Sequence, residues 1–189
     1  PLPVSATFEE AGPPVIVDAT MAISDIDSED LDGGSLDVDI TIGGTVNDEL
    51  LITETGGITV EEAEGDFYVL YNGTAIGVID GTFEGSAGHL LVTFNTDSTP
   101  EAVEALAQAI AFTNDKVIPD TTDREITFTI DDGDGGLATE VVTVELLLEG
   151  GLVRNDHNQG TDTDWFTAAN WTQGVLPDAT MVAIIKGPA

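Results

Sequence analysis

Along most of the chain, apolar and polar residues alternate with a period of two, the pattern of β-strands that bury one face. Residues 36–42 place Leu36, Val38, Ile40 and Ile42 on one face, opposite two aspartates and a threonine. The same alternation predicts further strands at residues 90–94, 125–130 and 139–148. Residues 67–79 predict a β-hairpin, because Asn72-Gly73 supplies the two positive-φ positions of a type I′ turn between apolar runs.

Residues 98–112 break this period. Their apolar positions recur at helical spacing: Val103, Leu106, Ala107 and Ile110. Thr99 is suited to cap the N-terminus of a helix, with Pro100 at its first position. One short helix among strands fits a β-sandwich better than alternating βαβ units, which would need several helices. The predicted fold class is therefore mostly β, a β-sandwich with one short inserted helix.

The organisation changes after residue 148. We expect a module at residues 1–148, a linker at 149–160 that begins with a Glu-Gly-Gly run, and a C-terminal β-rich segment at 161–189 that holds both tryptophans. Roughly thirty residues cannot build a core alone. The segment is thus the start of a second module, a part packed on the first domain, or a strand exchanged with another chain.

The charge narrows the choice of partners. The chain has 36 acidic residues and 4 basic ones, a formal charge of -32, yet 41% of its residues are hydrophobic and its mean hydropathy is positive. This composition argues against disorder, which needs low hydrophobicity as well as high charge. No basic patch is available to bind nucleic acid or an anionic membrane surface. Cations or a basic protein remain as partners that could offset the self-repulsion.

Cysteine is absent, which excludes disulfides, a thiolate nucleophile and zinc-thiolate sites. No apolar run approaches the roughly 20 residues of a membrane span, and no signal peptide opens the sequence. We therefore expect a soluble part of a mature protein, without direct membrane insertion.

Two acidic runs lie where predicted strands end. Asp25-Ile-Asp27 precedes the strand at 36–42, and the run at 131–136, Asp-Asp-Gly-Asp-Gly-Gly, lies between the last two strands. Calcium takes six to eight oxygen ligands, and glycines allow a loop to turn its carbonyls inward. Neither run matches an EF-hand: read from Asp25, Asp30 stands where the turn glycine belongs. A solvated acidic turn therefore remains the alternative to a calcium loop.

The order of several segments resembles the cadherin-like, immunoglobulin-like tandem repeats of large bacterial calcium-dependent surface adhesins, over about residues 4–148. The segments are Glu9-Glu10, 23–28, 36–40, 71–77, 91–95, 99–106 and 131–136. The resemblance implies a β-sandwich with Ca²⁺ bound near the module end, in arrays that calcium stiffens. It implies these metal ligands: Glu10, Asp25, Asp27, Asp132 and Asp134, and less clearly Asp30 and Asp32.

The C-terminal segment is similar to one that opens β-rich repeat regions of other bacterial surface proteins, through residues 164–171 and 174–177. Its apolar run at 181–185 suggests a hypothesis, that a neighbouring copy completes this segment as in donor-strand assembly. The alternative is the beginning of the next domain.

No enzyme is predicted. Among 36 acids some pair lies at catalytic separation by chance. His89 and His157 have no metal-ligand partner at short spacing, and Ser86 lacks the strand-to-helix turn of a nucleophile elbow.

The sequence thus predicts a non-enzymatic module of a secreted or cell-surface adhesin or surface filament. Its expected partners are neighbouring modules or copies of the chain, with cell-surface glycans or proteins as further candidates. Two alternatives stay open: a carbohydrate-binding module that uses Trp165 and Trp171, and a salt-adapted acidic domain without discrete metal sites.

Overall fold

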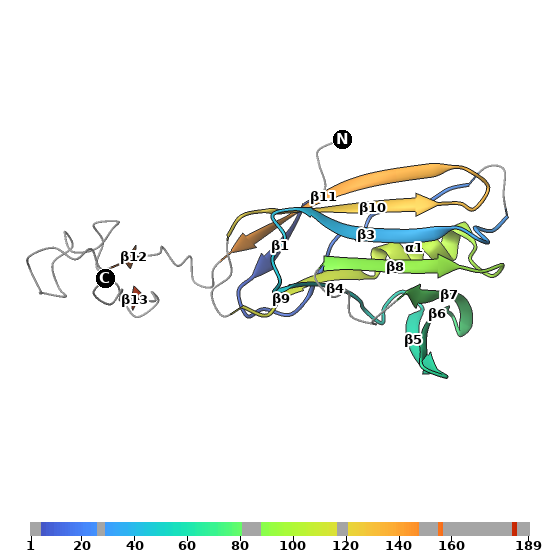
Figure 1. The fold of residues 1–189 in the computed structure, drawn as a ribbon, viewed down its shortest axis with the longest axis horizontal. Helices are drawn as coiled ribbons and strands as arrows, with labels where there is room; N and C mark the ends of the chain where they lie inside the picture. The colour runs from blue at the N-terminus through green and yellow to red at the C-terminus, as the bar shows by residue number, and fades with distance from the viewer. Residues whose placement is uncertain are drawn as a thin grey trace, which may run out of the picture. The chain divides into compact units, whose positions relative to one another are not determined.

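The computed structural model describes residues 5–25, 29–80, 88–116, 121–147, 155–156 and 183–184. The chain divides into two compact units, Pro1–Leu146 and Leu147–Ala189. The first unit is mostly β with one short helix among its described residues, as predicted (Figure 1). In the second unit the structure describes a parallel pair, β12 (Asn155–Asp156) and β13 (Ala183–Ile184). The predicted linker and tail otherwise lie outside the described residues.

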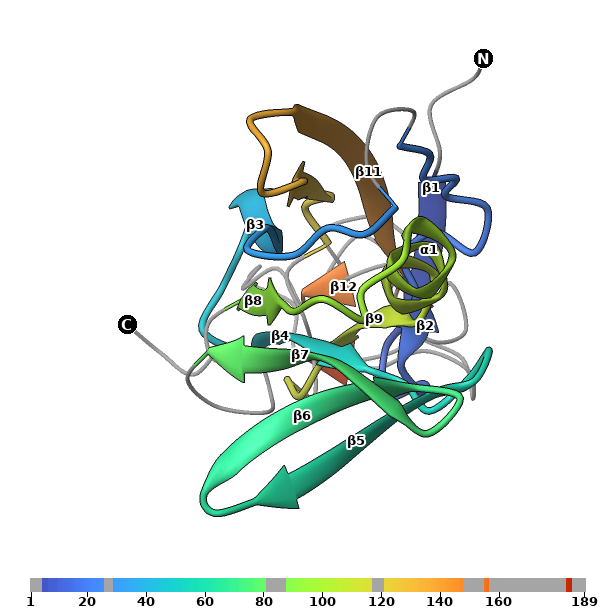
Figure 2. The same cartoon turned by 90° about the vertical axis from the view of Figure 1, so that its right-hand side faces the viewer.

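The first unit contains two sheets. The larger has the strand order β1-β11-β10-β3-β8-β7-β6-β5, and the smaller has the order β2-β9-β4. The strands of the larger sheet are β1 (Ser5–Glu9), β3 (Ser35–Ile42), β5 (Ile58–Ala63), β6 (Asp66–Tyr71), β7 (Thr74–Asp80), β8 (His89–Phe94), β10 (Arg124–Asp131) and β11 (Leu137–Leu147). Those of the smaller sheet are β2 (Val15–Ile16), β4 (Asp48–Ile52) and β9 (Ile110–Asn114). Figure 2 shows how β5, β6 and β7 extend the larger sheet away from β3.

The strands expected from alternation are present as β3, β8, β10 and β11, within two residues of the predicted bounds. The predicted hairpin is β6 and β7, paired so that Tyr71 lies opposite Thr74. Asn72 and Gly73 have φ values of 51° and 84°, the positive values that a type I′ turn requires. Local sequence therefore determines these elements.

The helix, α1, spans Pro100–Gln108, and Thr99 caps it by accepting a hydrogen bond from the Ala102 amide. The hydroxyl of Tyr71 donates to a carboxylate oxygen of Glu101 at 3.0 Å, which raises the pKa of Tyr71 and links α1 to β6.

The expectation that Ile110 belongs to the helix is wrong. The helix ends at Gln108, and Ile110 begins β9. β9 is the central strand of the smaller sheet, and its first three residues are buried. A strand buried on both faces lacks alternation, so its run of apolar residues gives the same pattern as the continuation of a helix.

The two sheets and the helix share one hydrophobic core. It includes Val92 and Phe128 from the larger sheet, Leu50 and Phe112 from the smaller, and Leu106 from α1. The ring of Phe8 in β1 meets that of Phe112 edge-to-face, with centroids 5.4 Å apart, so the inner faces of the sheets are in direct contact.

A buried ion pair also joins the sheets. The Arg124 guanidinium of β10 donates to both carboxylate oxygens of Asp48 in β4, through Nε at 2.9 Å and Nη2 at 3.3 Å. Asp48 also accepts from the Asn114 side-chain amide at 2.5 Å and from the Thr45 backbone amide at 2.6 Å. Arg124 and Asp48 are fully buried. Their charges are thus compensated by each other and by neutral donors.

We predict that Arg124→Met lowers the free energy of unfolding by about 3–5 kcal/mol, because it leaves the Asp48 carboxylate buried without its cation. Lys116→Met is the matched control, since it removes the same charge from an exposed position and should cost less than about 0.5 kcal/mol. Urea unfolding at neutral pH measures both. Equal losses in the two variants would show that the buried pair does not hold the sheets together.

Candidate functional site

The structure brings two acidic loops, residues 29–34 and 131–136, to the same end of the larger sheet. β10 and β3 pair with Asp131 opposite Ser35, so the loops that follow Asp131 and precede Ser35 are neighbours. A Cβ placed on Gly34 would lie 2.1 Å from the carbonyl oxygen of Asp131, and one on Gly133 would lie 2.2 Å from that of Asp32. Only glycine allows so close an approach of the two backbones. The loops at 29–34 and 131–136 are called the acidic loops below.

Several carboxylates of the acidic loops accept hydrogen bonds from backbone amides of the same loop. Asp132 accepts, through Oδ1, the backbone amides of Asp134 and Gly136, each at 2.8 Å. Asp131 accepts the Gly133 amide at 2.9 Å, and Asp30 accepts the Asp32 amide at 3.2 Å. These side chain to backbone bonds are Asx-type turns, which need no metal to form.

Apart from Glu10, the predicted ligands separate into three groups. Asp30 and Asp132, on the acidic loops, and Asp25, near them, are half-buried, whereas Asp32 and Asp134 are exposed on the loops. Asp27 lies outside the described residues.

Glu10 is not brought to the acidic loops. It follows β1, which runs toward the end of the larger sheet where β11 finishes, opposite the β10–β11 turn (Figure 1). The Oε2 atom of Glu10 is buried and has no hydrogen-bond partner within the described part of the chain. An unpaired buried carboxylate oxygen is costly, so a donor or a cation would be favoured there.

The structure does not gather these residues into a ready ligand cage. In the ranges that the structure describes, no three His, Asp or Glu side chains are grouped so that they could hold a metal ion. The groups at the acidic loops that could bind a metal are carboxylates and main-chain carbonyls, the hard oxygen ligands that calcium prefers. The chemistry therefore fits calcium, while a complete site needs further ligands.

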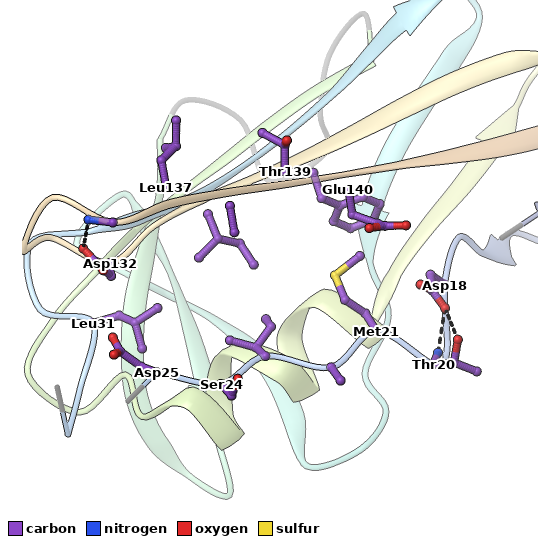
Figure 3. A pocket seen from close by; sticks show the side chains of 16 residues that line it. Asp18, Thr20, Met21, Ser24, Asp25, Leu31, Asp132, Leu137, Thr139 and Glu140 are labelled. Atoms are coloured by element: carbon purple, nitrogen blue, oxygen red, sulfur yellow. Dashed lines mark hydrogen bonds between the residues drawn. The ribbon is translucent and has the colours of Figure 1, made fainter. Parts of the chain in front are cut away.

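A cavity of about 650 Å³ adjoins the acidic loops (Figure 3). One wall is the segment that contains Met21 and Ile23, and the other comprises Phe128 of β10 and the first residues of β11. Asp25 and Asp132 lie toward one end of the cavity, and Asp18 lies toward the other.

Asp18 is a site residue that the sequence analysis missed. It is 4% exposed, and its Oδ1 atom accepts from both the amide and the hydroxyl of Thr20. The only sequence signal is the spacing Asp-x-Thr, which is typical of such a turn but does not indicate burial.

Of the other candidates, the structure describes only His89. His89 is a surface residue as predicted, and its Nε2 lies 2.9 Å from Asp37 across β8 and β3, with both side chains about half exposed. Trp165, Trp171, Ser86 and His157 lie outside the described residues. Exposed acids also lie on strands away from the acidic loops, as Asp39, Glu62 and Glu145 do, so the distribution of charge leaves salt adaptation open.

Comparison with protein-family models, curated proteins and solved structures gave no match. Among the described residues, no helix is long and apolar enough to cross a membrane.

Glycine substitutions test the contact between the acidic loops. Gly133 and Gly135 have positive φ values of 84° and 106°, but only a Cβ on Gly133 would meet another loop. Both alanine variants should lose about 1 kcal/mol from backbone strain, and Gly133→Ala should lose a further 1–3 kcal/mol, approximately, from the clash with Asp32. Equal losses in chemical denaturation would mean that the loops do not touch.

Proposed function

We propose that residues 1–148 form an immunoglobulin-like, cadherin-like β-sandwich module of an extracellular bacterial adhesin or surface filament, and that calcium at the acidic loops makes the module rigid. The proposed role is structural and non-enzymatic. The observation that carries it is the convergence of two acidic loops that are about a hundred residues apart in the sequence, at one end of a sheet, with backbones in contact. Like charges held so close repel, and a divalent cation removes that repulsion.

The two ends of the sheet suggest how modules would join. The acidic loops lie at one end, whereas Glu10 and the end of β11, where the chain leaves the first unit, lie at the other (Figure 1). In a head-to-tail array, the Glu10 end of one module would meet the acidic loops of the next. Calcium at this junction would gain ligands from two modules, which agrees with an incomplete cage in a single one.

Linkage sets the size of the expected effect. A ligand that binds only the folded form stabilises it by RT ln(1 + [L]/Kd), about 1.4 kcal/mol at ten times Kd. Extracellular calcium modules often have a Kd of roughly 10⁻⁴ to 10⁻³ M. Millimolar calcium should therefore raise the free energy of unfolding of the module measurably, and removing calcium should lower it.

We predict that Asp134→Asn has effects of opposite sign in the two conditions. In chelator it should raise the melting temperature slightly, because it relieves repulsion within the loop, and in calcium it should reduce the calcium-dependent rise. Glu62→Gln is the control, since it removes the same charge from an exposed position of β5. The measurement is thermal unfolding at fixed high ionic strength, so that general screening is the same in every sample.

Two results would contradict the proposal. If calcium did no more than an equal ionic strength of sodium, the acidity would be a salt-adapted surface without discrete sites. If Glu62→Gln reduced the calcium effect as much as Asp134→Asn, calcium would act on the whole surface and not at the acidic loops.

A further inference from the structure

The first half of β11 is exposed on a face that is buried further along the strand. Val142, Val144 and Leu146 point into the core and are buried. Ala138 and Glu140 share their side of the strand, since side chains alternate with a period of two, yet both are exposed. The beginning of β11 is therefore exposed on the side that faces the core further along the strand.

The partner strand confirms that this face belongs to the core. Ala138 and Glu140 lie opposite Ile130 and Phe128 of β10, and Phe128 is 1% exposed. The 650 Å³ cavity lies between this part of the two strands and the segment that contains Met21. Its volume is in the range of ligand sites, and Leu31, Phe128 and Ile130 give it an apolar interior.

Among the described residues, no strand other than β1 pairs with the edge of β11 that faces away from β10. β1 has five residues against eleven in β11, and it lies beside the later part of that strand (Figure 1). The Asp132 amide donates to the Gly136 carbonyl at 3.2 Å, so the alternation of an antiparallel ladder directs the backbone groups of Leu137 and Thr139 away from β10. Such an edge is a template for an added strand.

The charge of the cavity indicates what kind of strand would fit. Four carboxylate side chains line it: Asp18, Asp25, Asp132 and Glu140. No Lys, Arg or His is among the lining residues. The acids lie toward both ends, with Asp25 and Asp132 at one and Asp18 at the other, and Glu140 extends toward Asp18 (Figure 3). A segment with an apolar centre and basic residues at both ends would match this pattern.

We propose that a partner protein binds here by adding an extended segment to the edge of β11 at residues 137–141. The alternate apolar side chains of this segment would enter the cavity, and its flanking Lys or Arg residues would meet the carboxylates. A second copy of the chain is a poorer occupant, because each copy carries a charge of -32 and only 4 basic residues. The inference goes beyond the proposed structural role, and it shares two carboxylates, Asp25 and Asp132, with the proposed calcium ligands.

The test uses a labelled peptide of alternating valine and threonine with lysine at both ends, and the same peptide with glutamate at both ends. We expect the lysine peptide to bind the full chain, as measured by fluorescence anisotropy with calcium and with chelator. Glu140→Lys should weaken binding about tenfold, because attraction becomes repulsion. Glu145→Lys is the matched control: it makes the same charge change at an exposed position of β11 that does not line the cavity.

A second variant tests the contribution of the cavity's shape to peptide binding without changing its charge. Ala138→Phe places an apolar ring in the part of the cavity beside the edge of β11, so it should block peptide binding without lowering the melting temperature. The proposal is overturned if the glutamate peptide binds as well as the lysine peptide, if neither binds, or if Glu145→Lys weakens binding as much as Glu140→Lys. It is also overturned if the chain self-associates without peptide and Ala138→Phe abolishes that association, since the occupant would then be a second copy.

Discussion

The structure depends first on the ion pair between Arg124 and Asp48. The chain has 36 acidic and 4 basic residues, and one of the few cations is placed fully inside the protein, against an aspartate of the opposite sheet. The pair fixes how β10 and β4 face each other, because both oxygens of Asp48 accept hydrogen bonds, from Arg124 of β10, Asn114 of β9 and the Thr45 amide. It also leaves the remaining acids with almost no basic side chains to neutralise them.

The shortage of basic side chains matters most at the acidic loops. Glycines at positions 34 and 133 let the backbones touch, and Asx-type bonds hold each loop in shape. The fold thus concentrates negative charge at one end of the sheet by main-chain packing alone. The proposed calcium would neutralise part of this negative charge at the acidic loops. The proposed basic partner segment would neutralise part of it nearby, along the edge of β11.

Much of the fold could be predicted from local sequence, because period-two alternation, the Asn72-Gly73 turn and the Thr99 cap are short-range signals. The end of the helix could not, since the apolar run from Ile110 suits a buried strand as well as a helix. Burial of Arg124 was readable in principle, because it shares the parity of Ile126 and Phe128. The position of Glu10 and the place of β11 near the edge of the described sheet follow from strand order, which no local pattern encodes.

Hydrogen–deuterium exchange with calcium and with chelator, at equal ionic strength, tests the central claim most directly. The account predicts that calcium slows exchange at residues 29–34 and 131–136 more than in β5 and β6, which carry exposed acids but lie outside the acidic loops. Protection spread evenly over the exposed strands, or no protection, would contradict a calcium site at the acidic loops.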